Sequence, residues 1–275
     1  MTFSERFRVN PDVGFKLSSL DPNDKDKFID ADDARSETEK YAHHMRELQY
    51  RLFAEGKRGL LICLQAMDAG GKDGVIRHVL GYMNPQGCRV VRFSVPSVEE
   101  ARHDFLWRIH RVIPRKGEVV IFNRSHYEDI LVPRVHERLS ESIVSERINA
   151  INAFEDYLTT NDVQILKFFL HISKEEQLDR FKKRIEDQNR WWKISESDYT
   201  ERQYWETYEK AYEEILNQCS SKKAPWFVIP ANHKWYRNLV VSGIVVEYME
   251  SMQINFPEPT VDIEEIKRRY HKEKE

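Results

Sequence analysis

Short apolar runs alternate with amphipathic segments along most of this chain. Five runs have the length and composition of buried strands, and they lie at residues 59–65, 89–95, 118–122, 163–172 and 226–230. Helical spacing of apolar residues predicts helices over residues 33–56, 75–80, 97–113, 140–159, 174–219 and 235–252. Strands that alternate with helices predict an α/β fold, in which a five-stranded parallel sheet has helices on both faces.

The domain organisation follows from the same pattern. No internal repeat or low-complexity linker divides the sequence, so we expect a single domain over residues 1–275 with an N-terminal extension over about 1–56. The charged helical region at about 174–220 is interrupted near 187–197, which predicts an inserted lid. Ligands of such sheets bind at the carboxyl ends of the strands.

The first predicted strand runs directly into a glycine-rich turn. That turn reads Ala-Met-Asp-Ala-Gly-Gly-Lys-Asp-Gly at residues 66–74, and a helical pattern begins at Val75. Glycines let the backbone approach an anion closely, and the amide groups at the start of a helix point toward it. Lys72 adds a positive charge. Strand, glycine-rich loop, lysine and helix together predict a phosphate-binding site.

The loop departs from the usual pattern G-x-x-x-x-G-K-[ST] in two places. Ala66 stands at the first glycine position, and Asp73 replaces the serine or threonine that would bind magnesium. Asp68 adds another carboxylate inside the loop. Carboxylates beside a bound phosphate would repel it unless a divalent cation lay between them. We therefore expect a phosphoryl-transfer site that uses Mg²⁺, with Mn²⁺ as the alternative ion.

The third predicted strand ends in a second group of polar residues. Asn123 and Arg124 lie at its tip, and Glu128 and Asp129 follow one turn later. An arginine here can form paired hydrogen bonds with a phosphoryl group and neutralise the charge that develops during transfer. For His126, a packed core residue and a binding residue both remain open.

Cations are concentrated in two further segments. The predicted lid contains Arg180, Lys183, Arg184, Arg190 and Lys193, interleaved with Phe181, Trp191 and Trp192. Arginines are also frequent over residues 101–116, and together with Arg77 and Arg134 they could line a groove for an extended anion. A solvated charged helix is the alternative interpretation of the lid.

Composition narrows the function classes. A net charge of −3 with 32% charged residues argues against a broadly basic nucleic-acid-binding protein. No apolar run approaches the roughly 20 residues that span a bilayer, and the first residues lack the pattern of a signal peptide. The three cysteines are scattered, which favours neither a zinc site nor a disulfide framework. We expect a cytoplasmic protein that binds neither nucleic acid nor membranes.

Several motifs resemble those of the polyphosphate kinase 2 family. They lie at residues 66–74, 122–129, 190–195, 224–232 and 234–238, and the resemblance runs from about residue 7 to 257. It implies a P-loop kinase with a helical lid, related in architecture to thymidylate kinases. It also implies reversible, magnesium-dependent phosphoryl transfer between inorganic polyphosphate and a nucleotide.

The resemblance also assigns roles to individual positions. Asp68 and Lys72 match the loop carboxylate and lysine of the family, and Arg124 matches its strand-end arginine, so these three are the expected catalytic residues. The expected polyphosphate contacts are Ala69, Gly70, Gly71, Lys72, Asp73, Arg77, Arg134, Arg184, Arg190 and Lys193. The expected nucleotide contacts are Asn123, Arg124, His126, Tyr127, Glu128 and Arg180. The expected metal ligands are Asp68 and Glu128.

One departure from the family pattern bears on the substrates. Many relatives have aspartate where this chain has Asn123, so Glu128 would take over as the second metal carboxylate. This version of the motif resembles the class III subgroup, which phosphorylates AMP and ADP, and GMP and GDP are further candidate acceptors. The alternatives are an ATP-dependent nucleoside monophosphate kinase and a non-catalytic polyanion-binding protein. A homo-oligomer, dimer or tetramer, is expected through residues 33–56 and 257–275.

Overall fold

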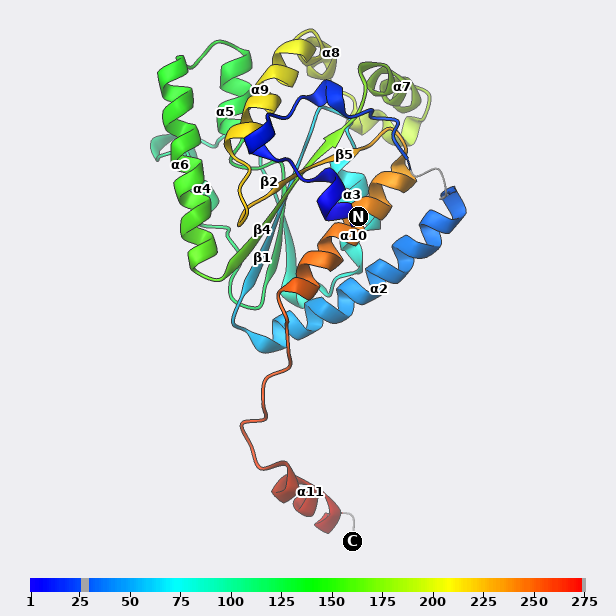
Figure 1. Ribbon diagram of the computed structural model, residues 1–275, viewed down its shortest axis with the longest axis vertical. Helices are drawn as coiled ribbons and strands as arrows, with labels where there is room; N and C mark the ends of the chain where they lie inside the picture. The colour runs from blue at the N-terminus through cyan, green and yellow to red at the C-terminus, as the bar shows by residue number, and fades with distance from the viewer. Residues whose placement is uncertain (26–29, 274–275) are drawn as a thin grey trace.

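A computed structural model describes residues 1–25 and 30–273. A five-stranded parallel sheet with the order β2-β3-β1-β4-β5 forms its centre (Figure 1). The strands are β1 (Gly59–Ala66), β2 (Cys88–Arg92), β3 (Val119–Asn123), β4 (Val163–His171) and β5 (Trp226–Pro230). All five predicted strands are therefore confirmed, and β2 is shorter than expected.

The middle of the sheet is buried on both faces. Every residue of β1 is buried, and β1 pairs with β3 on one side and β4 on the other, with Ile62 opposite Ile121 and Leu166. This burial explains why β1 and β4 read as continuous apolar runs rather than as alternating ones. Because the strands are parallel, the segments that follow β1, β3 and β4 all leave the same edge of the sheet.

Helices cover both faces of the sheet. In Figure 1, α5 (Glu128–Val135), α6 (Glu141–Thr160) and α9 (Trp205–Gln218) lie on one side. On the other side α10 (Lys234–Ser251) contacts β4 and β5, α3 (Lys72–His78) contacts β1 and β3, and α2 (Ala31–Glu55) packs on α10. The result is a three-layer α/β/α arrangement.

The ends of α2 follow directly from its sequence. The carboxylate of Asp30 accepts hydrogen bonds from the amides of Asp32 and Asp33 at the N-terminus. At the other end Gly56 has a φ of 61°, the left-handed conformation that glycine adopts without strain and that ends a helix. The predicted helix over residues 33–56 is confirmed.

The segment over residues 97–113 differs from the single helix that was predicted. It contains a 3₁₀ turn at Glu100–Arg102 and a short helix, α4 (Trp107–His110). Between them His103 is extended, and the Asp104 carboxylate accepts a hydrogen bond from the amide of Leu106. An aspartate that bonds its own backbone in this way competes with continuous helix.

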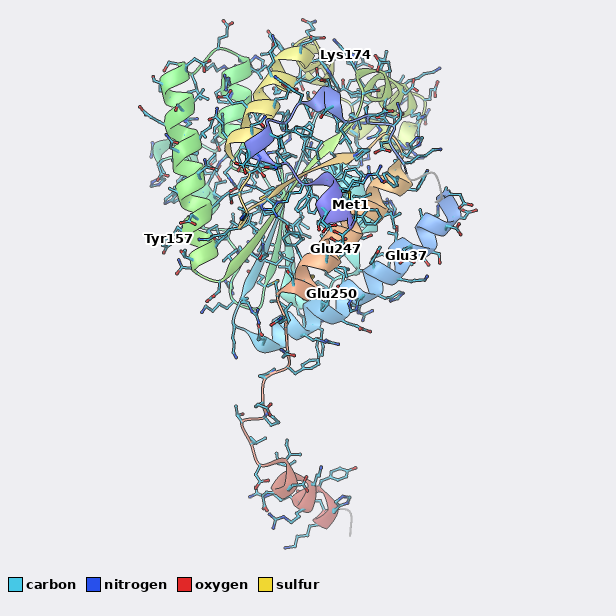
Figure 2. The ribbon with its side chains drawn as sticks, in the orientation of Figure 1. Met1, Glu37, Tyr157, Lys174, Glu247 and Glu250 are labelled. Atoms are coloured by element: carbon cyan, nitrogen blue, oxygen red, sulfur yellow. The ribbon has the colours of Figure 1, made fainter. Side chains whose placement is uncertain are left out.

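The first residues of the N-terminal extension form short helical elements. Helix α1 (Phe3–Phe7) begins the chain, and 3₁₀ turns follow at Pro11–Val13 and Leu17–Ser19. The amides of Phe3 and Ser4 donate to the carboxylate of Glu247 on α10, which lies beside the start of the chain in Figure 2. Phe7 is buried in the core, so this extension is part of the fold.

The remaining helices lie around the carboxyl edge of the sheet and at the C-terminus. The charged region contains α7 (Lys174–Ile185), a 3₁₀ turn at Gln188–Lys193 and α8 (Glu196–Arg202). The last helix, α11 (Ile263–Lys272), stands apart from the rest of the molecule at the end of an extended stretch (Figure 1). Within the described ranges, no helix has the length and apolarity to cross a bilayer.

Candidate active site

The glycine-rich loop after β1 makes a compact turn into α3. Ala69 and Gly71 both have positive φ, 60° and 107°. A Cβ on Gly70 would lie 2.4 Å from the Ala66 Cβ, and a Cβ on Gly71 would lie 2.0 Å from Nη1 of Arg237. Glycine is therefore required at both positions, because a larger side chain would collide with the loop itself or with a buried guanidinium.

Lys72 lies at the first position of α3 with its side chain folded back over the loop. Its Nζ donates a hydrogen bond to the carbonyl oxygen of Ala66 at 3.1 Å. Burial lowers the pKa of Lys72, and the nearby guanidinium of Arg124 lowers it further. A half-buried ammonium that donates to a backbone carbonyl is well suited to bind an incoming phosphate.

Arg124 bridges the ends of β1 and β3. Its Nη2 lies 3.0 Å from Oδ1 of Asp68, and its Nη1 lies 3.9 Å from Oε2 of Glu128. Burial alone would lower the pKa of Arg124, but the carboxylates of Glu128 and Asp68 outweigh it and raise that pKa. Burial has the opposite effect on the carboxyl group of Glu128, because it raises the pKa of an acid. Asp68, Arg124 and Glu128 thus form one charged cluster.

The backbone of Arg124 is held in an unusual conformation. Its φ is 62°, which is costly for a residue with a side chain. The amide of Arg124 donates to the carbonyl of Leu64 at 3.1 Å, and the Gln65 amide donates to Oγ of Ser125 at 3.1 Å. These contacts to β1 fix the turn that directs the guanidinium toward the glycine-rich loop.

Two of the residues that depart from the common motifs, Asp73 and Asn123, contact each other. The side-chain amide of Asn123 donates to Oδ1 of Asp73 at 2.9 Å, and Nζ of Lys193 lies 3.6 Å from Oδ2 of the same carboxylate. Burial opposes ionisation, but Asn123 and Lys193 together lower the pKa of Asp73. An aspartate at position 123 would place a second carboxylate beside that of Asp73, and the two would repel each other. Asn123 avoids this repulsion, so the two departures from the common motifs are compatible as a pair.

Two buried arginines close the other side of the loop. Arg180 on α7 donates from Nη1 to the carbonyl of Ala69 at 2.8 Å and from Nη2 to the carbonyl of Ala231 at 2.5 Å. Arg237 on α10 is only 2% exposed, and burial together with the charge of Arg180 lowers its pKa to about 9. Both guanidinium groups therefore hold positive charge directly beside the glycines.

A cavity of about 1280 Å³ opens between the loop, α2, α10 and the 174–202 segment. Cationic side chains outnumber the carboxylates in its wall. The cations are Arg35, Lys72, Arg77, Arg92, Arg124, Arg180, Lys183, Arg184, Arg190, Lys193, Lys234 and Arg237. The carboxylates are Glu39, Asp68, Asp73, Asp187 and Asp198. Such a wall suits a ligand with several negative charges.

Most of the predicted site residues meet at this cavity. They are Asp68, Ala69, Gly70, Gly71, Lys72, Asp73, Arg77, Asn123, Arg124, Arg180, Arg184, Arg190 and Lys193. Glu128 lies beside them, behind Arg124, with its side chain 16% exposed. The sequence thus predicted which distant segments come together, although the roles of the residues stay predictions.

The structure places three predicted site residues away from the cavity. His126 and Tyr127 are fully buried, and both side chains bond to the carboxylate of Glu155, at 3.1 Å and 2.8 Å. Arg134 lies on α5 and forms ion pairs with Glu141 and Glu214. For the first two the cause is the turn at Arg124, after which the chain enters the core between β3 and α6.

Four cations of the cavity wall were not singled out from the sequence: Arg35, Arg92, Lys234 and Arg237. Lys234 and Arg237 fall within the motif at 234–238, so that motif was the available signal. Arg35 belongs to α2, which was expected to form an N-terminal extension and a contact between subunits. Its presence shows that the α2 face contributes to the site.

The metal-binding capacity of the site is limited. Within residues 1–25 and 30–273, no group of three or more histidine, cysteine, aspartate or glutamate side chains is arranged to hold an ion alone. Asp68 offers a carboxylate on the cavity wall with its side chain 27% exposed. Mg²⁺ commonly binds through one or two carboxylates plus substrate phosphates, so this donor set fits that ion.

Sequence comparison identifies the family. The sequence profile of the family described as polyphosphate kinase 2 matches residues 28–257. The chain belongs to the polyphosphate kinase 2 family. The chain is 44% identical over 263 residues to an "AMP/ADP-polyphosphate phosphotransferase" of Meiothermus ruber, covering 95% of this chain and 98% of that protein.

Two further comparisons agree with this assignment. This polyphosphate kinase 2 chain is 41% identical over 273 residues to an "ADP-polyphosphate phosphotransferase" of Rhodopseudomonas palustris, covering 94% of this chain and 93% of that protein. The crystal structure of polyphosphate kinase 2 from Arthrobacter aurescens superposes with a TM-score of 0.95 at 37% identity, covering 99% of this chain and 97% of that one. The match in sequence and fold covers nearly the whole chain.

Proposed function

We propose that this protein is a transferase that moves a phosphoryl group reversibly between inorganic polyphosphate and AMP or ADP, as class III members of its family do. The main support for this proposal is the cavity wall. Besides the glycine-rich loop and Arg124, it contains more cationic side chains than the phosphates of a single nucleotide need. The similarity to the Meiothermus ruber and Rhodopseudomonas palustris proteins supports the substrates. GMP and GDP are proposed as further acceptors.

The chemistry rests on positioning and charge. Lys72 and the loop amides bind the terminal phosphates of the donor, and Arg124 neutralises charge on the group in transfer. The attacking phosphate oxygen of the acceptor is already anionic, so no strong general base is required. Aligning two anions that repel each other is then the main task of the surrounding cations.

The metal ligands are proposed from the same geometry. Asp68, on the cavity wall, would hold Mg²⁺ or Mn²⁺ together with substrate phosphates, and Glu128 behind Arg124 would be the second carboxylate. The ion, when bound, neutralises phosphate charge between donor and acceptor.

The remaining assignments concern the cavity edges. We infer that residues 174–220 form a lid in a single catalytic domain, and that Arg184, Arg190 and Lys193 contact polyphosphate when the lid closes. The loop residues 69–73 and Arg77 would bind the same chain, with Arg134 at the outer end of its path. Asn123 and Arg180 would contact the nucleotide, whereas His126 and Tyr127 would act by supporting the turn at Arg124 from the core.

The cellular context is proposed from cysteine usage, surface exposure and net charge. A cytoplasmic location is supported by the three unpaired cysteines. Self-association is supported by α11, where Ile263 and Ile266 are 41% and 48% exposed on a helix that stands apart from the core. Nucleic acid is not proposed as a partner because the net charge is −3.

The decisive experiment is a donor exchange. Purified protein is incubated with Mg²⁺ and AMP, with polyphosphate or ATP as donor, and the nucleotides are separated by chromatography. We expect ADP and ATP from polyphosphate and no product from Lys72→Ala, whose circular dichroism spectrum should match wild type. Turnover with ATP alone would replace the proposal with an ordinary nucleotide kinase, and near-normal turnover in Lys72→Ala would contradict the role of the loop.

A further inference from the structure

Two neighbouring tryptophans in the 3₁₀ turn at Gln188–Lys193 have different surroundings. The indole N–H of Trp191 donates to the carbonyl oxygen of Ile185 at 2.8 Å, and Trp191 is 54% exposed. Trp192 is 75% exposed, and its side chain lines the cavity. An indole this exposed buries little apolar surface, so packing within the chain gives no reason for a tryptophan at position 192.

Trp192 also differs from the other aromatic residues of the cavity wall. Tyr82 packs edge-on against His43, with ring centroids 6.1 Å apart. Trp235 packs edge-on against Tyr236 at 5.7 Å and rests on the core. The ring of Trp192 instead has the ammonium of Lys193 beside it, 4.8 Å from the ring centroid. Of these three rings, that of Trp192 is the most accessible to a ligand.

The indole and the phosphate-binding loop share a neighbour, the ammonium of Lys193. The ammonium of Lys193 lies 3.6 Å from the Asp73 carboxylate, at the start of α3. The Lys193 ammonium is therefore close both to the indole and to the start of α3. An acceptor nucleotide has to bring its phosphate to the donor phosphate held at the loop, and from there it can place its base against the indole.

We propose that Trp192 is the platform on which the base of the nucleotide substrate stacks. This inference rests on the proposed function, because it takes a nucleoside mono- or diphosphate as the ligand. Stacking uses the flat face of the base, which all bases have, and not the pattern of donors and acceptors on its edge. Trp192 thus favours purines by their stacking area and discriminates little between adenine and guanine.

The test compares ligands with and without a base. Full-length wild type and the Trp192→Ala, Trp192→Phe and Trp191→Ala variants are titrated with AMP, GMP and ribose 5-phosphate in the presence of Mg²⁺ by calorimetry or competition. Stacking is worth about 1–3 kcal/mol per base, so Trp192→Ala should weaken AMP and GMP by about fivefold or more and leave ribose 5-phosphate unchanged. Trp192→Phe should keep most of the wild-type affinity for AMP and GMP. Trp191→Ala should keep the wild-type ratio of AMP affinity to ribose 5-phosphate affinity.

The outcomes separate this inference from the proposed function. Equal weakening of AMP and ribose 5-phosphate in Trp192→Ala would show that the residue supports the lid, and unchanged AMP affinity would show no stacking, so either result overturns the inference. A wild-type protein that makes no nucleotide from polyphosphate, yet binds AMP through Trp192, would contradict the proposed function and leave the stacking platform intact.

Discussion

Two charged clusters lie on either side of the turn after β3, and they are built differently. The first, Asp68 with Arg124 and Glu128, borders the cavity, and its Asp68–Arg124 pair is 27% and 38% exposed. The second, Glu155 with Lys167, is fully enclosed, and Tyr127 and His126 complete its hydrogen bonds. The first cluster borders the cavity, where a ligand can reach it, whereas the second forms its hydrogen bonds within the fold.

The sequence places these clusters side by side. Arg124, His126 and Tyr127 belong to the same short motif, yet the first contributes to the cavity and the other two to the core. The positive φ of Arg124 lies at the turn from β3 into α5, between the residue that borders the cavity and the two that enter the core. A motif shared by a family can therefore contain residues that line the site next to residues that stabilise the core. The backbone conformation decides which residue has which surroundings.

The largest expected effect is the loss of activity without a loss of stability. Arg124→Ala removes the cation that neutralises the transferred group, which should reduce turnover by about 10³-fold or more. The pair is partly exposed, so the free energy of unfolding should change by no more than about 1 kcal/mol. Turnover with saturating polyphosphate and the urea midpoint measure the two quantities.

A matched surface pair provides the control for Arg124. Arg6 lies 2.8 Å from Asp24, and the two side chains are 37% and 27% exposed, almost the same as in the pair at the cavity. Arg6→Ala should therefore have a similar small effect on stability and leave turnover at the wild-type level. Equal losses of activity in both variants would mean that the position of Arg124 at the cavity is irrelevant.

The second prediction concerns stability in the enclosed cluster. Lys167→Met leaves the Glu155 carboxylate buried without its cation, which should lower the free energy of unfolding by about 3–5 kcal/mol. Lys223→Met is the control, because Lys223 pairs with Asp156 at 2.9 Å on the surface and should cost at most about 1 kcal/mol. Urea unfolding of both variants gives the comparison, and equal destabilisation would remove the distinction between the two clusters.

The limits of prediction from sequence follow the same division. The strands and the loop could be predicted because burial and phosphate binding each require a characteristic local pattern, as at residues 59–74. The burial of His126 could not, because it depends on the φ of Arg124 and on Glu155, which lies 29 residues away. Arg35 was missed because only the packing of α2 on α10 brings it to the cavity.

The smallest expected effect is the response of the enclosed cluster to acid. Burial alone would raise the pKa of Glu155, but Lys167 and the hydrogen bond from His126 outweigh it, so the folded-state pKa lies below the ordinary value of 4.5. The ionised carboxylate therefore stabilises the fold fully above about pH 4.5, and this stabilisation is lost as the pH falls through the folded-state pKa.

Glu155→Gln makes this dependence measurable, because glutamine resembles the protonated carboxyl at every pH. The melting temperature of the variant should lie below that of wild type at pH 7, and the gap should narrow as the pH is lowered from 5 toward 3. Glu258→Gln, in the exposed C-terminal stretch, should show no gap at any pH. A gap for Glu155→Gln that stays constant would mean that the carboxylate contributes by shape alone, and that the enclosed cluster is held together by packing and not by charge.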